Sequence, residues 1–200
     1  ARGVLIPFLK LVSRQHVEGL ENLPKDGGFI VVGNHLTDLD SLTAMRTLVD
    51  ADIPVYSLAK ASLFKVPVVG QVLAAGGQIP VQRGTAHATD ALAEAAKRLQ
   101  EGSCIIIFPE GTLSRDPLKW PMVGKTGAAR LAMQSGVPVI PMGQWGAHFI
   151  LDTYSHHLKV GKRKDVRVKI GPALDLSQYG SDIEDRQKVR ECTAEIMSAI

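Results

Sequence analysis

Residues 29–40, Phe-Ile-Val-Val-Gly-Asn-His-Leu-Thr-Asp-Leu-Asp, place an apolar run directly before a polar loop and the start of a helical pattern. Phe29–Val32 has the length and β-branched content of a buried strand. Thr37 and Asp38 supply helix-capping side chains before the apolar pattern of Leu39–Val49. We therefore expect a strand, a loop and a helix in direct succession.

The same alternation of apolar runs and helical patterns continues along the chain. Further candidate strands are Val55–Ala59, Gln78–Val81, Cys104–Phe108, Val137–Met142 and Val166–Ile170. Further candidate helices are Ala86–Leu99, Lys125–Gln134 and a last helix that opens with the capping pattern Ser181–Glu184. Alternating strands and helices favour an α/β fold, with a mainly parallel, mixed central sheet and helices on both faces.

Length and composition narrow the classes of protein. Two hundred residues favour one domain, residues 1–200, by the usual domain size of about 150 residues. A chain with 45% hydrophobic and 22% charged residues is not a disordered polypeptide. The net charge of +3 is too small to indicate a nucleic-acid partner. Cys104 and Cys192 form no metal or disulfide framework, which favours a reducing, cytosolic setting.

Two long stretches without Asp, Glu, Lys or Arg raise the question of membrane spans. Residues 66–82 and 131–151 contain prolines and glycines that would leave backbone groups unpaired in lipid, so we expect buried strands and turns there. Val4–Val12 is apolar but short, and Pro7 and Lys10 interrupt it. It is either a first helix packed on the core or, as part of residues 1–15, a segment that contacts a membrane interface.

Polar and charged residues follow each expected strand. Because ligands bind outside the carboxyl ends of parallel strands, we expect these residues to converge. They are Gly33–Asp40, Lys60, Gln82–Gly84, Pro109–Arg115 and Gly143–Gly146. A histidine, carboxylates, cations and glycines at one edge predict an anion-binding site that contains a base.

Familiar catalytic patterns are missing from the sequence. Gly124-Lys125-Thr126 resembles the end of a phosphate-binding loop, but the first glycine of that motif is absent. No Gly-x-Ser-x-Gly occurs, so the common serine-hydrolase pattern is excluded. His156-His157 has no carboxylate at metal-ligand spacing, and His-Glu-x-x-His is absent.

His35 and Asp40 form the pair that carries chemistry. Five residues of ideal helix would place them roughly 140° apart, so a turn must bring them together. Asp40 could then hold one imidazole nitrogen and leave the other as a base. Three alternatives stay open at this point: Asp40 only caps the helix, Asp38 is the partner instead, or His35, Asp38 and Asp40 bind a metal.

Four blocks of sequence resemble the glycerolipid acyltransferases, the family of 1-acyl-sn-glycerol-3-phosphate acyltransferases. They are the NHx4D motif Asn34–Asp40, then Ile79–Arg83, Phe108–Thr112 and Val137–Pro141, in the family's order. The resemblance covers roughly residues 16–172, and Trp120–Leu131 further resembles the actinobacterial branch. It implies a fold like that of glycerol-3-phosphate acyltransferase.

The resemblance implies transfer of a fatty acyl group to the sn-2 hydroxyl of lysophosphatidic acid, which makes phosphatidic acid in phospholipid biosynthesis. The donor is acyl-CoA or acyl-carrier protein, and neither cofactor nor metal is expected. His35 acts as the general base and Asp40 orients it. Glycerol 3-phosphate or another lysolipid is the alternative acceptor, and a non-catalytic module that binds anionic lipid is the alternative from another class.

The remaining site residues follow from the same resemblance and from their chemistry. Arg83 offers a planar fork to the substrate phosphate, with Lys60, Arg115 and Lys125 as helpers. The family commonly has an arginine directly after the third block, where this chain has Leu113, so that phosphate contact must come from another cation. In the third block, Glu110 is expected to orient an arginine or accept a substrate hydroxyl, while Gly111 and Thr112 let backbone donors approach the oxyanion.

A run of basic residues precedes and enters the last expected strand: Lys159, Lys162, Arg163, Lys164, Arg167 and Lys169. It is either a solvated hairpin face or a surface for anionic headgroups or coenzyme A phosphates. Together with residues 1–15 it predicts a peripheral or monotopic protein on the cytoplasmic face of the cell membrane.

Overall fold

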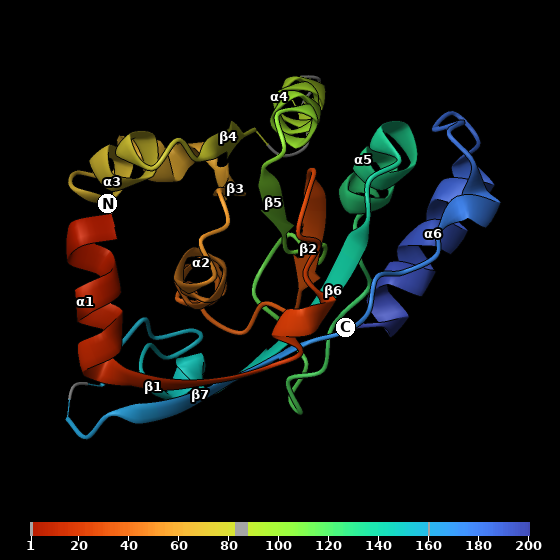
Figure 1. The fold of residues 1–200 in the computed structure, drawn as a ribbon. Helices are drawn as coiled ribbons and strands as arrows, with labels where there is room; N and C mark the ends of the chain where they lie inside the picture. The colour runs from red at the N-terminus through yellow and green to blue at the C-terminus, as the bar shows by residue number, and fades with distance from the viewer. Residues whose placement is uncertain (1, 83–87, 160) are drawn as a thin grey trace.

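A seven-stranded sheet forms the centre of the structure, a computed structural model that describes residues 2–82, 88–159 and 161–200 (Figure 1). The strands are β1 Ser13–Glu18, β2 Phe29–Gly33, β3 Val55–Lys60, β4 Ile79–Val81, β5 Cys104–Ile107, β6 Val139–Trp145 and β7 Lys164–Ile170. The α-helices are α1 Arg2–Val12, α2 Asp40–Asp50, α3 Val69–Ala75, α4 Ala88–Gln100, α5 Gly127–Ser135 and α6 Arg186–Ser198.

The strand order is β1-β7-β6-β2-β5-β3-β4. The five strands from β6 to β4 are parallel, whereas β7 runs antiparallel to β6 and parallel to β1. The mainly parallel, mixed sheet predicted from the sequence is therefore confirmed. The carboxyl ends of the five parallel strands lie at one edge, where ligands bind in folds of this kind.

The two faces of the sheet bury two apolar cores. Ile30 and Val32 of β2 face the core shared with α4, α5 and α6. Phe29 and Val31 face the core shared with α1 and α2. Successive side chains of a strand point to opposite faces, so a fully buried strand needs the continuous apolar run that β2 has. Helices on both faces are thus confirmed (Figure 1).

Two elements differ from the sequence-based expectation. Residues 13–18 form the edge strand β1, which was not predicted from the sequence. Arg14, His16 and Glu18 point to solvent on alternate positions, so the strand has no continuous apolar run. The expectation of buried strands and turns over residues 66–82 is wrong for α3. There Gly70, with no β-carbon, packs against the backbone of Phe64 in the preceding turn and lets the helix form close to it.

Two other expectations need smaller corrections. The stretch 131–151 begins inside α5, as the helix predicted over Lys125–Gln134 requires, so only its later part consists of strand and turns. The last helix begins at Arg186 rather than at residues 181–184, because the carboxylate of Asp185 caps it by accepting hydrogen bonds from the backbone N–H groups of Gln187 and Lys188.

The apolar N-terminal segment forms α1. Leu9 packs into the core, while Phe8 and Leu11 are exposed. In the described part of the chain, no helix combines the length and the apolar composition that crossing a membrane requires.

Candidate functional site

The loops after β2 and β5 meet at the carboxyl edge of the sheet, joined by Glu110. Its Oε1 accepts a hydrogen bond from the backbone N–H of His35 at 2.9 Å, and its Oε2 accepts one from Met122 at 3.0 Å. The backbone N–H of Ser114 donates to the carbonyl of His35 at 2.7 Å. Both oxygens of Glu110 are thus engaged by backbone N–H groups, a role that the sequence did not predict.

Glu110 is only 2% exposed, and this burial raises the pKa of its carboxyl group. The hydrogen bonds from Met122 and His35 act in the opposite direction, because they favour the charged form. Burial is the larger effect. The loop that carries His35 is therefore held by hydrogen bonds to a carboxyl group that is almost completely shielded from water.

The His35 imidazole and the Asp40 carboxylate lie together, as the sequence predicted. Nδ1 of His35 is 3.2 Å from Oδ2 of Asp40, the first residue of α2. The same oxygen accepts hydrogen bonds from the backbone N–H groups of Leu36 and Thr37. These contacts fold the loop into the tight turn that an NHx4D spacing needs.

This geometry determines the useful tautomer of His35. An ionised carboxylate only accepts hydrogen bonds, so Nδ1 must carry the hydrogen and Nε2 is left as a proton acceptor. The imidazole also stacks on Phe108, with ring centroids 4.3 Å apart and planes inclined by 22°. The ring is therefore held by a carboxylate at one nitrogen and by an aromatic face.

Asn34 fastens the same loop to β6. Its side chain donates to the carbonyl of Gln144 at 2.9 Å and accepts from the N–H of Gln144 at 2.7 Å. The side-chain oxygen of Gln144 in turn accepts a hydrogen bond from Thr43 of α2. The backbone on either side of His35 is thus anchored to strand and helix.

The segment of residues 147–159 also reaches the site, which the sequence did not predict. The carbonyl of Leu151 accepts a hydrogen bond from the hydroxyl of Thr37 at 2.7 Å. Nδ1 of His156 lies 3.0 Å from Oδ2 of Asp38. The fold thus supplies the carboxylate that His156 lacks in the sequence. The pairing is visible only in the folded structure, because Asp38 and His156 are far apart in the sequence.

The pairing of Asp38 also bears on the alternatives for the His35 site. Asp38 faces His156, whereas Asp40 faces His35. Within residues 2–82, 88–159 and 161–200, no group of three or more His, Cys, Asp or Glu side chains is arranged to hold a metal ion. In the described residues, the three-ligand set required by the metal alternative is not assembled.

The predicted cations occupy different places along the edge. A β-carbon at Gly111 would lie 2.9 Å from Cδ and 3.1 Å from Nζ of Lys125, so the Lys125 side chain covers the backbone of Gly111. Lys60 ends β3 in register with Val81, the last residue of β4. Arg83 lies outside the described residues.

Thr112, the last residue of the third block, and Arg115, three residues beyond it, are exposed. Both lie in the loop after β5. The backbone N–H of Arg115 donates to the sulfur of Met122, which holds the base of its side chain beside the Glu110 loop.

Comparison with known proteins identifies the class of protein to which this fold and its His35–Asp40 pair belong. The model of the family described as "Acyltransferase" matches residues 14–145. The chain belongs to this family.

Individual relatives within this family carry more specific names. The chain is 31% identical to a chloroplastic 1-acyl-sn-glycerol-3-phosphate acyltransferase of Brassica napus, over 94% of this chain and 52% of the relative. It is 32% identical to the enzyme of that name from Escherichia coli, over 86% of this chain and 65% of the relative. The chain thus spans about half to two thirds of the length of these relatives.

A solved structure supports the same relationship. The crystal structure of the 1-acyl-sn-glycerophosphate acyltransferase PlsC from Thermotoga maritima matches with a TM-score of 0.68 and 28% sequence identity. The match covers 96% of this chain and 75% of that one. The resemblance expected from the four sequence blocks is confirmed at the level of family and fold.

Proposed function

We propose that this protein transfers a fatty acyl group from a thioester donor, acyl-CoA or acyl-carrier protein, to the sn-2 hydroxyl of lysophosphatidic acid. The observation that carries the proposal is the buried contact of Asp40 with Nδ1 of His35, which leaves Nε2 as a base. The names of the relatives supply the acceptor, because the geometry of the base alone does not distinguish one hydroxyl from another.

The reaction follows from this arrangement without a covalent acyl-enzyme. Nε2 of His35 removes the proton of the sn-2 hydroxyl while the hydroxyl oxygen attacks the thioester carbonyl. The tetrahedral intermediate breaks its carbon–sulfur bond, and the imidazolium of His35 returns the proton to the departing thiolate. Asp40 stabilises the imidazolium and fixes its orientation, as the acid of a catalytic triad does.

Glu110 acts in this proposal as a positioning residue. The sequence suggested that it orients an arginine or accepts a substrate hydroxyl. Because both of its oxygens accept hydrogen bonds from backbone N–H groups, we assign it to holding the His35 loop. Gly111, beneath the side chain of Lys125, and the exposed Thr112 stay assigned to the tetrahedral oxyanion.

The substrate phosphate is assigned to Arg83, with Lys60, Lys125 and Arg115 as helpers. An arginine fork matches two phosphate oxygens at once. Arg83→Ala is expected to raise KM for lysophosphatidate strongly and KM for acyl-CoA weakly. Equal effects on the two KM values would contradict this assignment.

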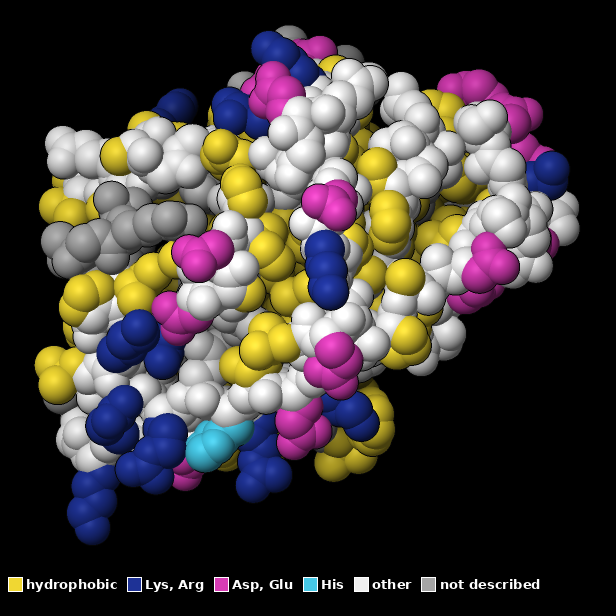
Figure 2. Space-filling model, viewed as in Figure 1, with side chains coloured by type: hydrophobic (Ala, Val, Ile, Leu, Met, Phe, Trp, Pro, Cys, Tyr) yellow, Lys and Arg dark blue, Asp and Glu magenta, His cyan; other side chains and the backbone are white. Residues whose placement is uncertain are grey.

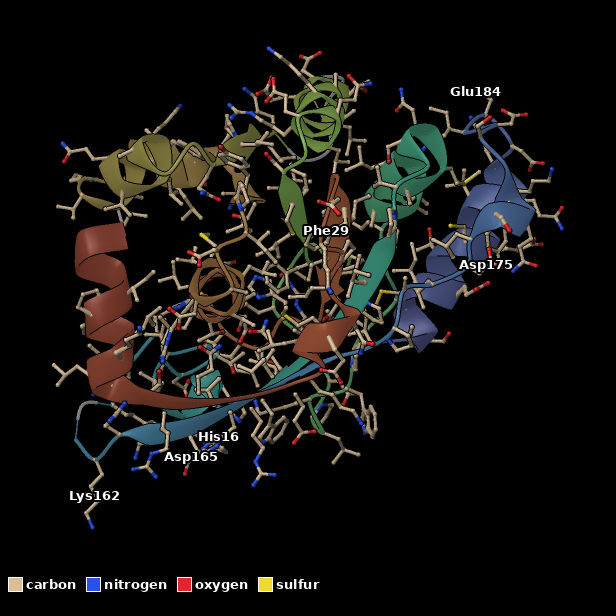
Figure 3. The ribbon with its side chains drawn as sticks, in the orientation of Figure 1. His16, Phe29, Lys162, Asp165, Asp175 and Glu184 are labelled. Carbon is tan, nitrogen blue, oxygen red and sulfur yellow. The ribbon has the colours of Figure 1, made fainter. Side chains whose placement is uncertain are left out.

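A lipid acceptor also implies contact with a membrane surface. Phe8 and Leu11 of α1 are exposed, and so are Val66 and Val68 just before α3 and Val69 at its start. Figure 2 shows hydrophobic side chains on this side of the molecule, with Lys and Arg side chains below them. Lys162, in the loop before β7, lies there too (Figure 3). We assign this side to the cytoplasmic membrane surface.

Vesicle flotation tests the membrane contact. Binding is expected to be stronger with anionic than with zwitterionic vesicles, and to weaken with added salt and on Leu11→Ser. Binding that ignores lipid charge and salt would contradict the electrostatic part of the assignment.

Thiol release from palmitoyl-CoA tests the proposed reaction. Lysophosphatidate, glycerol 3-phosphate or no acceptor is supplied in detergent, with a chelator present. We expect release that requires lysophosphatidate and survives chelation. A requirement for glycerol 3-phosphate would change the acceptor, and release without acceptor would indicate a thioesterase. Binding of anionic lipid without any transfer would indicate a non-catalytic module.

A further inference from the structure

A cavity of about 480 Å³ opens beside the proposed active site, on the other side of Asn34. This volume is within the range of small-molecule pockets, about 300 to 1,000 Å³. Its wall comes from the loop after β5 and from β6 and β7. The residues that decide its chemistry are Asn34, Lys119, Trp120, Trp145, Arg167 and Lys169.

Strand pairing explains why cations and an indole gather on one wall. Arg167 and Lys169 are two residues apart on β7, so both point to the same face of the sheet. In the antiparallel pair, Trp145 of β6 stands opposite Arg167, and Gly143 stands opposite Lys169. Gly143 has no side chain, and a β-carbon there would lie 3.7 Å from the carbonyl oxygen of Ile200, which also lines the cavity.

The lining of the cavity is both cationic and aromatic. Among the described residues, three cationic side chains and both tryptophans of the chain line it, and no carboxylate side chain does. Trp120 and Trp145 are partly exposed, so their rings are accessible to a ligand. Cations bind phosphate groups, and indole faces stack on flat heterocycles. The combination is suited to a phosphorylated nucleotide.

We propose that this cavity binds the adenosine 3′,5′-bisphosphate end of coenzyme A, and that acyl-CoA is therefore the donor. The inference rests on the proposed acyl transfer and deepens it by assigning a place to the donor. Asn34 lies in the cavity wall and directly precedes His35, so the cavity and the proposed base share the loop after β2. The acceptor phosphate stays assigned to Arg83, with Lys60, Lys125 and Arg115 as helpers, none of which lines this cavity among the described residues.

The position of Arg167 and Lys169 also separates them from the rest of the basic run. Lys162 and Arg163 are exposed in the loop before β7, whereas Arg167 and Lys169 line the cavity. We assign the first pair to anionic headgroups and the second to nucleotide phosphates.

Tryptophan fluorescence tests the binding site without any turnover. Both tryptophans line the cavity, so titration with adenosine 3′,5′-bisphosphate is expected to change the emission in a saturable way. The double variant Arg167→Gln/Lys169→Gln is expected to raise Kd roughly tenfold or more. The control Lys25→Gln/Lys188→Gln removes two exposed charges that do not line the cavity and is expected to leave Kd unchanged.

Steady-state kinetics then tie the site to the donor. Arg167→Gln/Lys169→Gln is expected to raise KM for palmitoyl-CoA about tenfold, with KM for lysophosphatidate and kcat unchanged. The thermal midpoint of this variant, compared with that of the control, verifies that it is folded.

Each outcome bears on a separate claim. Transfer with no saturable response to the nucleotide, or a response of equal affinity in both double variants, would overturn the cavity assignment. So would a rise in KM for lysophosphatidate instead of palmitoyl-CoA, or a response to anionic vesicles alone. Saturable nucleotide binding without transfer to any acceptor would support the cavity and contradict the proposed acyl transfer.

Discussion

The His35 imidazole and the Asp40 carboxylate, 3.2 Å apart, form a buried pair, with side chains that are 13% and 2% exposed. Two other histidine–aspartate pairs have shorter distances but lie in solvent. His16 and Asp165 point from neighbouring strands on the outer face of the sheet (Figure 3), and His156 pairs with Asp38. Burial therefore distinguishes the pair proposed for catalysis, because a carboxylate acts more strongly on an imidazole where water is excluded.

Asp40→Asn and Asp40→Ala should have different effects. All three contacts of the carboxylate use one oxygen, so asparagine can retain the turn by placing its carbonyl oxygen there. We expect Asp40→Asn to reduce kcat strongly with little loss of stability, because the charge that stabilises the imidazolium is gone. Asp40→Ala should also reduce the free energy of unfolding by about 1 to 2 kcal/mol.

Urea unfolding and thiol release measured on the same preparations separate these effects. An Asp40→Asn variant with wild-type kcat would remove Asp40 from the mechanism. A fall in activity that merely tracks the fraction unfolded would leave Asp40 a structural role only.

Glu110→Gln should change how stability depends on pH. Burial raises the pKa of Glu110, so the folded protein holds this proton to a higher pH than the unfolded chain does. As the pH rises from the ordinary value of 4.5 through the raised pKa, the contribution of Glu110 to stability must fall. As the pH rises from 4 to 7, the unfolding free energy of wild type should therefore fall relative to that of Glu110→Gln. A constant difference in urea titrations would contradict this.

His148→Phe should reduce the sensitivity of the fold to acid. His148 is buried against Trp145 and Phe149, and within the described chain neither ring nitrogen has a hydrogen-bond partner. Burial, and then the charge of Lys119, lowers its pKa below 6.5. The unfolded chain thus takes up this proton first, and stability falls as the pH drops through 6.5 towards the lowered value.

Phenylalanine retains the ring packing and cannot be protonated. Between pH 7.5 and 5.5, His148→Phe should lose less unfolding free energy than wild type in urea titrations. Parallel losses in the two proteins would show that His148 does not contribute to the acid sensitivity.

Gly111→Ala and Gly102→Ala form a matched pair. Both glycines have positive φ, +66° and +82°, so alanine should destabilise each site by about 1 to 2 kcal/mol. Only at Gly111 would the new β-carbon meet a neighbour, the Lys125 side chain. Similar thermal midpoints with a lower kcat/KM for Gly111→Ala alone are expected. An equal kcat/KM in both variants would mean that the contact with Lys125 does not matter for the reaction.

Much of the architecture follows from local patterns in the sequence. The run Phe29–Val32 is buried on both faces and is therefore continuously apolar. For this reason β2 and the loop after it can be predicted from the sequence. The edge strand β1 has only one buried face and alternates polar residues outward, so its apolar signal is weak. α3 is short and its apolar side chains are largely exposed, so no helical stripe marks it.

The site was predictable only where its residues lie close together in the chain. His35 and Asp40 are joined by a local turn, and their spacing indicates it. The partners of Glu110 are backbone N–H groups, one of them 75 residues away, and no side-chain pattern encodes them. The contact of Asp38 with His156 likewise depends on how residues 147–159 pack over the loop.

The most direct test of the central claim is phosphatidate formation from palmitoyl-CoA and lysophosphatidate by wild type, His35→Ala and His16→Ala. His16 is the matched control, since it also pairs with an aspartate but lies on the outer face of the sheet. General-base catalysis predicts that His35→Ala reduces kcat by about 10² to 10⁴-fold, while His16→Ala retains wild-type kcat. Equal rates for wild type and a folded His35→Ala would contradict the account.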